Sequence, residues 1–281
     1  MSQQPTLTVI PLTTEEILGV GELLYRCTGM IFGENKRYYI ERRITERMRR
    51  TGIATVPAYL GLVRSHVGER EAFINAFTIN ETYFYREEHQ LAALSQSLLP
   101  DIVRNRRPGD LVRIWSMPCS SGEEAYSIAI WLLENWQLVD AYNIEIVGSD
   151  IDTAALGRAR EGQFTQRSLA RLPPALRDAY FEPEHGHHRR IIQDLRESVR
   201  FTHANIIDPA SMTGIGKFDV ILCRNVLIYF DDPARLAAAN ALYDSLNPGG
   251  YVCLGHSESM GRITDRFELA RLADAIVYRR P

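Results

Sequence analysis

The chain has 281 residues, of which 45% are hydrophobic and 24% are charged, and its formal net charge at pH 7 is −3. This composition excludes a disordered chain, and the length predicts one large domain with a smaller one. The negative charge is unfavourable for a dedicated nucleic-acid-binding protein. No basic start precedes an apolar run at the N-terminus, and no stretch is apolar over the length of a membrane span, so we expect a cytoplasmic protein.

The first predicted domain is helical, because residues 13–77 show only helix-like periodicity, broken by glycine and proline turn signals. Within it, Ile40, Ile44 and Met48 recur at helical spacing and predict one buried helix face. Seven positive and two negative residues lie between positions 36 and 50 of this helix. Its positive face comprises Lys36, Arg43, Arg47 and Arg50. The charge pattern alone fits a solvated face as well as a binding face.

The rest of the chain alternates short apolar runs with helical patterns. The predicted strands are Leu111–Trp115, Ile144–Val147, Val199–Thr202, Phe218–Cys223 and Tyr251–Leu254. This alternation predicts an α/β fold, with a mostly parallel sheet covered by helices on both faces. The tail, "RFELARLADAIVYRR", predicts a closing antiparallel hairpin. The long polar stretch Leu169–Arg200 predicts an inserted helix with a small β excursion.

The loop "RIWSMPCSSGEEAY", residues 113–126, joins the first predicted strand to a helix. It has one glycine and no lysine, so it lacks the groups that hold a phosphate in nucleotide-binding loops. Glu123 and Glu124 would repel a phosphate from the N-terminus of the helix. The structural alternative is helix capping, with Ser120 or Ser121 as the N-cap and the two glutamates in the first turn.

Asp150 follows the second predicted strand, where α/β nucleotide-binding proteins place an acid on ribose hydroxyl groups. A ribose without phosphates indicates a nucleoside with a cationic or zwitterionic appendage, and S-adenosylmethionine (AdoMet) fits this description. Asp150 and Asp152 could instead cap the next helix. Asn205, after the third predicted strand, is placed for an adenine-edge contact. Arg224 and Asn225 follow the fourth predicted strand at the same sheet edge, where His256 and Glu258 also emerge.

Metal and disulfide chemistry are not expected from the sequence. The four cysteines, Cys27, Cys119, Cys223 and Cys253, lie far apart and form no CxxC pair, so we expect reduced, partly buried thiols. Three of the seven histidines lie in "EHGHH", residues 184–188, with no carboxylate at ligand spacing. We therefore expect no metal site.

Five motifs together resemble a known family. They are "NETYFYRE", "WSMPCSSGEEAYSIA", "GSDID", "FDVILCRNVLIYFD" and "GGYVCLGHSE". Their order and spacing resemble those of the chemotaxis receptor glutamate methyltransferases, the CheR type, from about residue 15 to the C-terminus. The resemblance implies a Rossmann-like class I AdoMet-dependent catalytic domain over 96–281, with a small antiparallel β subdomain inserted at about 170–200. It further implies an N-terminal all-helical domain over 1–79 and a linker, 80–95, that contributes to the cofactor site.

The resemblance also assigns residues. Arg86 and Tyr229 are expected near the methyl-transfer site, in catalytic roles. Arg43, Arg47 and Arg50 of the basic helix are expected to bind the substrate, a glutamate-rich helical region of membrane chemoreceptors, by opposite charge. The cofactor contacts are expected at Asn80, Thr82, Arg86, Glu124, Asp150, Asn205, Ile206, Arg224 and Asn225, and Glu123 is left to helix capping.

The implied reaction is methylation of glutamate γ-carboxyl groups on chemoreceptors, which serves sensory adaptation. An ionised glutamate, with an ordinary pKa of about 4.3, is already a nucleophile near pH 7, so no general base is required. Arg86 would hold the cofactor's carboxylate or one substrate oxygen. Tyr229 would donate one orienting hydrogen bond, although an aromatic there is equally typical of core packing.

Two other functions share the cofactor domain. One is a non-catalytic signalling protein that binds AdoMet or its product S-adenosylhomocysteine (AdoHcy), against which the retained Arg86, Asn225 and Tyr229 argue. The other is a nucleic-acid methyltransferase, which is disfavoured because "RNVLIY" stands where amino-methylating DNA enzymes have a [D/N]PP[Y/F] segment. We expect a monomer, and the short insert is unfavourable for binding a receptor's tether peptide by strand addition.

Overall fold

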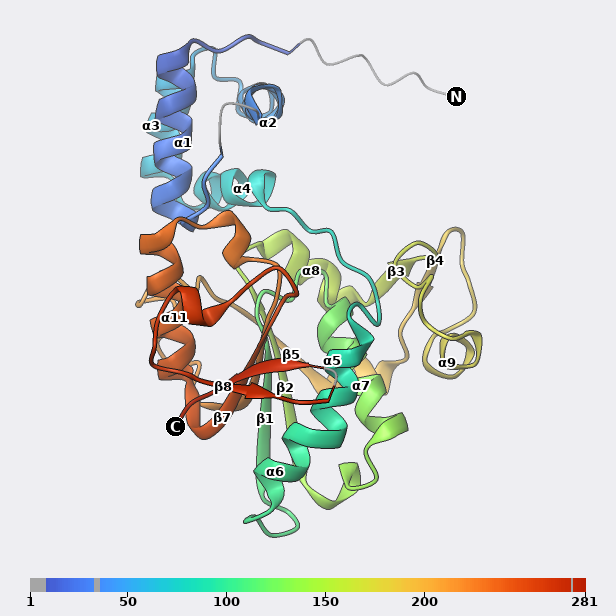
Figure 1. The fold of residues 1–281 in the computed structure, drawn as a ribbon. Helices are drawn as coiled ribbons and strands as arrows, with labels where there is room; N and C mark the ends of the chain where they lie inside the picture. Colours follow the sequence, from blue (N-terminus) through green and yellow to red (C-terminus); the bar gives the residue numbers. More distant parts are fainter. Residues whose placement is uncertain (1–8, 33–35, 274) are drawn as a thin grey trace. The chain divides into compact units, whose positions relative to one another are not determined.

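The computed structural model describes residues 9–32, 36–273 and 275–281, and the chain divides into two compact units (Figure 1). The helical unit contains the described residues up to Ile79 together with Tyr229–Asp231. The sheet unit contains Asn80–Ile228 and Asp232–Pro281.

The helical unit is built from four helices packed on one apolar core. Helix α1 begins with a capping box, in which Thr13 and Glu16 satisfy each other's backbone N–H groups, and it ends at Gly29 in the left-handed conformation. The buried side chains come from all four helices and include Val20, Ile44 and Phe73. The helices are α1 (Thr14–Thr28), α2 (Arg37–Thr51), α3 (Val56–Ser65) and α4 (Val67–Phe77).

The predicted buried face of the basic helix is confirmed. Ile40, Ile44 and Met48 of α2 are at most 3% exposed. This face packs into the core because its apolar side chains recur every four residues, close to the helical repeat of 3.6. The helical domain predicted from the periodicity of residues 13–77 is therefore present.

Arg47 does not lie on an exposed face, so that part of the predicted positive face is wrong. Its side chain is only 15% exposed and forms a bidentate ion pair with Glu69 of α4, with Nε–Oε1 at 2.9 Å and Nη2–Oε2 at 2.5 Å. Glu69 Oε1 also accepts a hydrogen bond from the buried Tyr59 hydroxyl at 2.8 Å. This network joins α2, α3 and α4, and helical periodicity alone could not reveal it because Glu69 lies 22 residues away.

A short segment from the second half of the chain belongs to the helical unit. Ile31 N–H donates to the Tyr229 carbonyl at 2.9 Å, and Met30 pairs with Phe230 in an isolated antiparallel bridge. The Tyr25 hydroxyl donates to Asp231 Oδ2 at 3.0 Å. Tyr229 therefore lies among residues of the helical unit, and its side chain also lies 5.8 Å from Lys36 Nζ.

The sheet unit contains a seven-stranded sheet in the order β5-β2-β1-β6-β7-β9-β8. The first five of these strands pair in parallel, while β9 is antiparallel to both β7 and β8. Both the parallel sheet and the closing hairpin predicted from the sequence are confirmed. The strands are β1 (Leu111–Ser116), β2 (Asn143–Asp150), β5 (Val199–His203), β6 (Phe218–Cys223), β7 (Leu246–Leu254), β8 (Glu268–Arg271) and β9 (Ile276–Arg279).

Helices cover both faces of this sheet, with α7 on one side and α11 on the other (Figure 1). All six residues of the central strand β6 are buried, as expected for a parallel strand with helices on both faces. Trp115 of β1 stacks on Phe218 of β6 with ring centroids 4.9 Å apart. The helices are α5 (Glu88–Ala93), η2 (Leu94–Leu98), α6 (Leu99–Val103), α7 (Glu123–Asn135), η3 (Val139–Ala141), α8 (Thr153–Glu161), α9 (Pro174–Tyr180), α10 (Gln193–Ser198), η4 (Leu227–Tyr229), α11 (Asp232–Ser245) and η5 (Met260–Arg262).

The insert forms a two-stranded antiparallel sheet with helix α9 between its strands, as predicted. Strand β3 (Gln163–Thr165) pairs with β4 (His188–Arg190). The predicted start near residue 170 is too late, because β3 already begins at Gln163. Its three residues are too few to show an alternating pattern, so the sequence did not reveal it.

The four cysteines are free thiols; Cys119, Cys223 and Cys253 are buried, and Cys27 is partly buried. Within the described parts of the chain, no helix combines the length and the hydrophobicity that crossing a membrane would require.

Replacing Arg47 with Ala tests the buried ion pair. Removal of one partner leaves the Glu69 carboxylate buried without its cation, and we expect the free energy of unfolding of the helical unit to fall by about 3 kcal/mol. Urea unfolding followed by circular dichroism measures this, while fluorescence of the tryptophans, which all lie in the sheet unit, should keep its midpoint. The control Arg50→Ala breaks only an exposed pair with Glu46 and should cost less than about 1 kcal/mol. Equal effects of both substitutions would contradict a stabilising role for the Arg47–Glu69 pair.

Candidate functional site

Asp150 ends strand β2 at the carboxyl edge of the sheet and is 4% exposed. Its Oδ2 accepts a hydrogen bond from Ser120 N–H at 2.7 Å, and its Oδ1 accepts one from Asp152 N–H at 2.9 Å. Burial raises the pKa of the Asp150 carboxyl to about 6, although these backbone N–H groups favour the ionised form. Asp150 is therefore a buried acceptor that fixes the loop after β1.

The loop after β1 comprises residues 117–122 and connects β1 to α7. Gly148 of β2 leaves space for it, because an added Cβ there would lie 2.7 Å from the Phe201 ring and 3.2 Å from Cys119 Cβ. The N-cap of α7 is Gly122, with a φ of 95°, and no side chain caps this helix. The alternative interpretation, capping by Ser120 or Ser121, is therefore wrong, because the left-handed turn at Gly122 begins the helix after both serines.

Asn80 joins the start of the sheet unit to this loop. Its Nδ2 donates to Asp152 Oδ2 at 2.7 Å, and its Oδ1 accepts from Ser120 Oγ at 3.0 Å. Asp152 is the N-cap of α8, since its Oδ1 accepts from Ala155 N–H at 2.9 Å. The capping role therefore holds for Asp152, whereas Asp150 accepts a hydrogen bond from the loop after β1.

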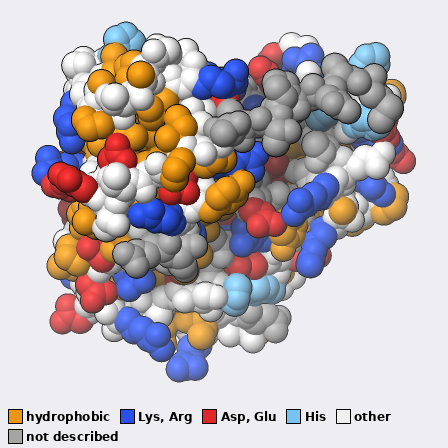
Figure 2. Space-filling model, turned by 90° about the horizontal axis from the view of Figure 1, so that it is seen from above, with side chains coloured by type: hydrophobic (Ala, Val, Ile, Leu, Met, Phe, Trp, Pro, Cys, Tyr) orange, Lys and Arg blue, Asp and Glu red, His pale blue; other side chains and the backbone are white. Residues whose placement is uncertain are grey.

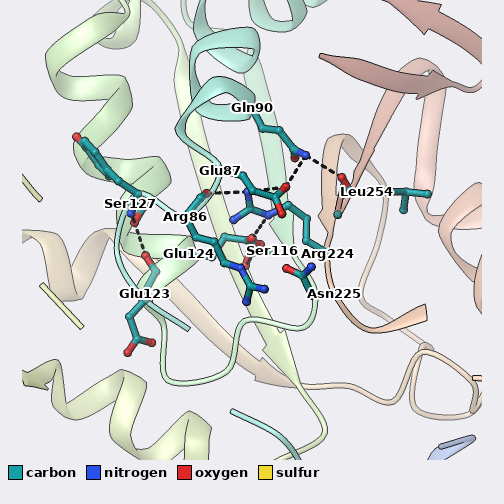
Figure 3. Close-up of polar contacts among 12 residues, drawn as sticks. Arg86, Glu87, Gln90, Ser116, Glu123, Glu124, Ser127, Arg224, Asn225 and Leu254 are labelled. Carbon is teal, nitrogen blue, oxygen red and sulfur yellow. Dashed lines mark hydrogen bonds and ion pairs between the residues drawn. The ribbon is translucent and has the colours of Figure 1, made fainter. Parts of the chain in front are cut away.

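A buried ion pair links the second and fourth of the recognised motifs (Figure 3). Arg224, 6% exposed, donates from Nε to Glu124 Oε2 at 2.5 Å, and Glu124 Oε1 accepts from Ser116 Oγ at 2.7 Å. Arg224 Nη1 donates to the Arg86 carbonyl at 2.9 Å and lies 3.8 Å from Glu87 Oε2. Burial lowers the pKa of Arg224, but the two carboxylates outweigh burial and raise it. The guanidinium thus joins α7, the loop after β6 and the segment before α5.

Glu87 extends this network toward β7. Gln90 Nε2 donates to Glu87 Oε2 and to the Leu254 carbonyl, each at 2.8 Å (Figure 3). Glu87 Oε1 lies 3.4 Å from Nδ1 of the exposed His256. Neither Glu87 nor Gln90 was predicted from the sequence, because their partners lie far away in the chain.

Glu123, which was predicted to cap the helix, has a different role. Its side chain is buried and accepts hydrogen bonds from Ser121 Oγ and from Ser168 Oγ, both at 2.8 Å. Burial raises the pKa of the Glu123 carboxyl, against the effect of the serine hydroxyls. The Ser168 carbonyl accepts from Phe84 N–H at 2.9 Å, so Glu123 and Ser168 together anchor the segment that carries Arg86.

The segment Asn80–Glu87 is held in an unusual backbone conformation. Tyr85 has a φ of 58° and Glu87 a φ of 55°, the left-handed region that non-glycine residues rarely adopt. Tyr85 N–H donates to Ser127 Oγ at 3.1 Å. Ser127 Oγ in turn donates to the Glu123 carbonyl at 2.6 Å (Figure 3). Together with the bond from Arg224 to the Arg86 carbonyl, these contacts fix the turn on α7.

The loop after β6 is held by a carboxylate. Asn225 has a φ of 61°, and its N–H donates to Glu258 Oε2 at 2.8 Å. Gly255 N–H donates to the same oxygen at 2.9 Å, and Ile228 N–H donates to Oε1 at 3.3 Å. A Cβ added at Gly255 would lie 2.7 Å from Asn225 Nδ2, so the loops after β6 and β7 are in direct contact. Glu258 was expected at this edge, but its contacts depend on the tertiary structure.

Two of the remaining predicted cofactor contacts, Asn205 and Ile206, lie in the loop after β5. Asn205 N–H donates to Ser211 Oγ at 2.7 Å, and Asn205 Oδ1 accepts from Ile207 N–H at 3.3 Å, which closes a local turn. Ile206 is 4% exposed, and Thr82 is partly exposed in the segment before Arg86. The preceding Ala204 donates its N–H to the Asp150 carbonyl at 3.1 Å, so this loop adjoins the end of β2.

The other predicted site residues lie in the helical unit. Arg43 places its guanidinium carbon 4.5 Å from the Tyr39 ring centroid, and Arg50 pairs with Glu46 at 2.7 Å. Arg47 forms the ion pair with Glu69 described above, and its role in substrate binding stays a prediction. Tyr229 has the contacts to Ile31 and Lys36 given above.

These residues fit AdoMet, the cofactor that the resemblance implies. The Asp150 carboxylate has about four acceptor positions, of which the backbone N–H groups of Ser120 and Asp152 use two, and a carboxylate acceptor is the group that ribose hydroxyl groups require. Asn205 and Asn225 offer amide groups at the same edge, while both oxygens of Glu124 are engaged by Ser116 and Arg224. No described residues form a group of three His, Cys, Asp or Glu side chains arranged to hold a metal ion.

Replacing Glu258 with Gln tests the carboxylate that holds the Asn225 loop. The amide NH₂ of the glutamine would face backbone N–H donors, so the hydrogen bonds to one of the two carboxylate oxygens are lost. We therefore expect AdoHcy affinity to fall about tenfold. Isothermal titration calorimetry measures this. The exposed Glu268→Gln is the matched control in the same unit and should bind like the wild type. Wild-type affinity in Glu258→Gln would show that the loop does not need the clamp to bind cofactor.

Comparison with known proteins identifies the family of the chain. The chain matches "CheR methyltransferase, all-alpha domain" over residues 15–78 and "CheR methyltransferase, SAM binding domain" over residues 80–276. Chemotaxis protein methyltransferase 2 of Vibrio cholerae serotype O1 is 44% identical over 274 residues, covering 97% of this chain and 95% of that protein. The chemotaxis protein methyltransferase of Escherichia coli (strain K12) is 36% identical, covering 89% of this chain and 86% of that protein. The chain therefore belongs to the CheR family of methyltransferases.

Proposed function

We propose that this protein transfers the methyl group of AdoMet to glutamate γ-carboxyl groups of chemoreceptors, in the service of sensory adaptation. The observation that carries the proposal is that polar residues of all five motifs, namely Asn80, Ser120, Asp150, Asn225 and Glu258, lie in the segments at the carboxyl edge of one sheet. There, Glu124 and Arg224 form a buried pair that fixes the backbone of Arg86. The names of the relatives, chemotaxis protein methyltransferases, support the receptor as the substrate.

The chain's residues have two tasks in this reaction. AdoMet supplies an electrophilic methyl group, and an ionised substrate carboxylate needs no general base to attack it. The first task is to hold the reacting atoms in line, at roughly 3 to 3.5 Å, and to exclude water. The second is to hold the carboxylate without strong withdrawal of its electron density, for which we propose Arg86, through one oxygen, and Tyr229, through one hydrogen bond.

Cofactor binding in this proposal uses the predicted residues in two ways. We assign direct contact to Asn80, Thr82, Asp150, Asn205 and Asn225, with Ile206 as an apolar contact. Glu124 and Arg224 are each engaged by protein groups, so we assign them mainly to positioning the Arg86 turn and to the local charge. Arg224 is only 6% exposed, so we assign its effect on the cofactor to its contacts with Glu124 and with the Arg86 carbonyl.

Helix α2 is proposed to attract the acidic receptor segment through Arg43 and Arg50. Arg42, which is exposed and forms no ion pair with any described residue, replaces Arg47 in this surface. On the face drawn in Figure 2, Lys and Arg side chains occur at several separate places with Asp and Glu between them. Attraction of the substrate is therefore local, in keeping with the net charge of −3.

We further propose that the enzyme acts in the cytoplasm as a monomer, on the cytoplasmic helices of its receptors. The non-catalytic alternative predicts cofactor binding without any ester formed. A nucleic-acid methyltransferase is disfavoured because "RNVLIY", residues 224–229, forms the short helix η4 and the three residues before it, in place of a base-stacking segment.

The direct test incubates the full chain with AdoMet carrying a labelled methyl group and membranes that contain the receptors of the source cell. We expect label on receptor bands that alkali releases as methanol, because methyl esters are base-labile. Arg42→Glu should reduce this labelling at low salt while AdoHcy affinity stays unchanged. Glu268→Gln serves as the control for handling and folding. AdoHcy binding without any alkali-labile label would favour the non-catalytic alternative.

The raised pKa of Asp150 gives the site a pH dependence. Burial holds the carboxyl protonated up to about pH 6, so the ionised form that accepts ribose hydroxyl groups dominates only above that pH. We expect AdoHcy affinity, measured by calorimetry, to fall by up to tenfold per pH unit as pH decreases below 6. Asp150→Asn should bind weakly at every pH and lose this dependence. An affinity that is constant from pH 5 to 7 in the wild type would exclude Asp150 as the titrating acceptor.

A further inference from the structure

Two basic side chains lie against Tyr83 in the sheet unit, and one of them, Arg171, belongs to none of the five motifs. Arg86 and Arg171 place their guanidinium carbons 5.8 Å and 5.2 Å from the centroid of the Tyr83 ring. These distances fall within the range of cation–π attraction. We define the Tyr83 surface as Glu81, Tyr83, Arg86, Arg167 and Arg171.

The charges on this surface are unbalanced. Arg167 Nη2 pairs with Glu81 Oε1 at 3.0 Å, and both side chains are largely exposed. Arg86 donates from Nη1 only to the Glu81 carbonyl, at 2.9 Å, and neither Arg86 nor Arg171 forms an ion pair with any residue that the structure describes. Arg171 is exposed and Arg86 is partly exposed, and neither cation has a carboxylate partner in the part of the chain that the structure describes, although the net charge of the chain is negative.

The backbone beneath these arginines is firmly held. Leu169 and Leu172, which flank Arg171, are 2% and 1% exposed and belong to the core of the sheet unit. Ser168 accepts a backbone hydrogen bond from Phe84 and donates its hydroxyl to the buried Glu123. The arginine at 171 is thus carried on an anchored turn, which lowers the entropic cost of a contact with a partner.

The Tyr83 surface is directly connected to the candidate site. The Arg86 carbonyl accepts from Arg224, which pairs with Glu124, so the backbone of Arg86 is part of the buried network. Arg86 also contacts the same ring as Arg171. A carboxylate that approaches Arg86 therefore also enters the field of Arg171.

We propose that the Tyr83 surface binds the glutamate-rich segment of the protein substrate, with Arg171 holding a carboxylate adjacent to the one that is methylated. The proposal rests on the proposed function and adds a second substrate contact, separate from α2. Arginine suits this task because its planar guanidinium stacks on an aromatic ring and still offers N–H donors to a carboxylate. Arg171 selects and orients the substrate and takes no part in the bond-forming step.

The test compares Arg171→Glu with Arg107→Glu in steady-state methylation of receptor-containing membranes. Arg107 is the matched control, since it is exposed, forms no ion pair with a described residue, and lies just before β1 at the opposite end of the strand from the site. We expect Arg171→Glu to raise the KM for receptor about tenfold, with kcat within about threefold of the wild type, because charge reversal repels the acidic segment. The effect should shrink at 0.5 M salt.

Two further measurements make the outcome decisive. The AdoHcy dissociation constant of Arg171→Glu should equal that of the wild type, which separates substrate binding from folding. Arg171→Lys, which keeps the charge but not the planar stacking, should recover part of the KM. A receptor KM in Arg171→Glu equal to that in Arg107→Glu would overturn the inference while leaving the proposed function intact. A wild-type enzyme that forms no alkali-labile ester would instead overturn the proposed function itself.

Discussion

The buried ion pair between Glu124 and Arg224 is the interaction on which the candidate site depends. It joins the first turn of α7, the loop after β6 and, through the Arg86 carbonyl, the segment before α5. Two charges removed from water are costly unless they are paired and hydrogen-bonded, and here Ser116 and Glu87 complete the environment. The pair is therefore better understood as a device that specifies one geometry than as a source of stability.

The same principle recurs around the edge of the sheet. Asp150 accepts one backbone N–H from the loop after β1 and one from the residues after β2, and Glu258 in the same manner accepts from the loops after β6 and β7. Glu123 anchors the insert through Ser168. Burial raises the pKa of all three carboxyl groups, so each clamp is strongest above the pH at which its group ionises. Loops that must present polar groups to a ligand are thereby made rigid by buried acceptors.

Strain is concentrated where these clamps act. Tyr85, Glu87, Ser120 and Asn225 all have positive φ values without being glycine, and all lie in segments fixed by the carboxylates or by Arg224. Such conformations persist only when the surroundings hold them, and they are typical of functional sites. Arg171 lies on the adjoining anchored turn, so the substrate contact proposed for it would meet a surface that is already ordered.

Much of the architecture was accessible from the sequence. The five core strands, the closing hairpin, the helical N-terminal domain and the β excursion were predicted, because apolar periodicity and turn residues are local signals. The start of the insert was misplaced, since three-residue β3 is too short to leave a pattern. The five motifs identified the family, which the matches over residues 15–78 and 80–276 confirm.

The sequence by itself determined the periodicity of each element and the polar residues that follow each strand, because both depend on neighbouring residues in the chain. Only the tertiary structure decided which of those polar groups pair with one another. Arg47 is committed to Glu69, Gly122 begins α7 in place of either serine, and Glu258 holds the Asn225 loop. Each of these contacts joins residues from different elements or depends on a backbone conformation. Such pairings depend on packing between distant segments, which no local pattern records.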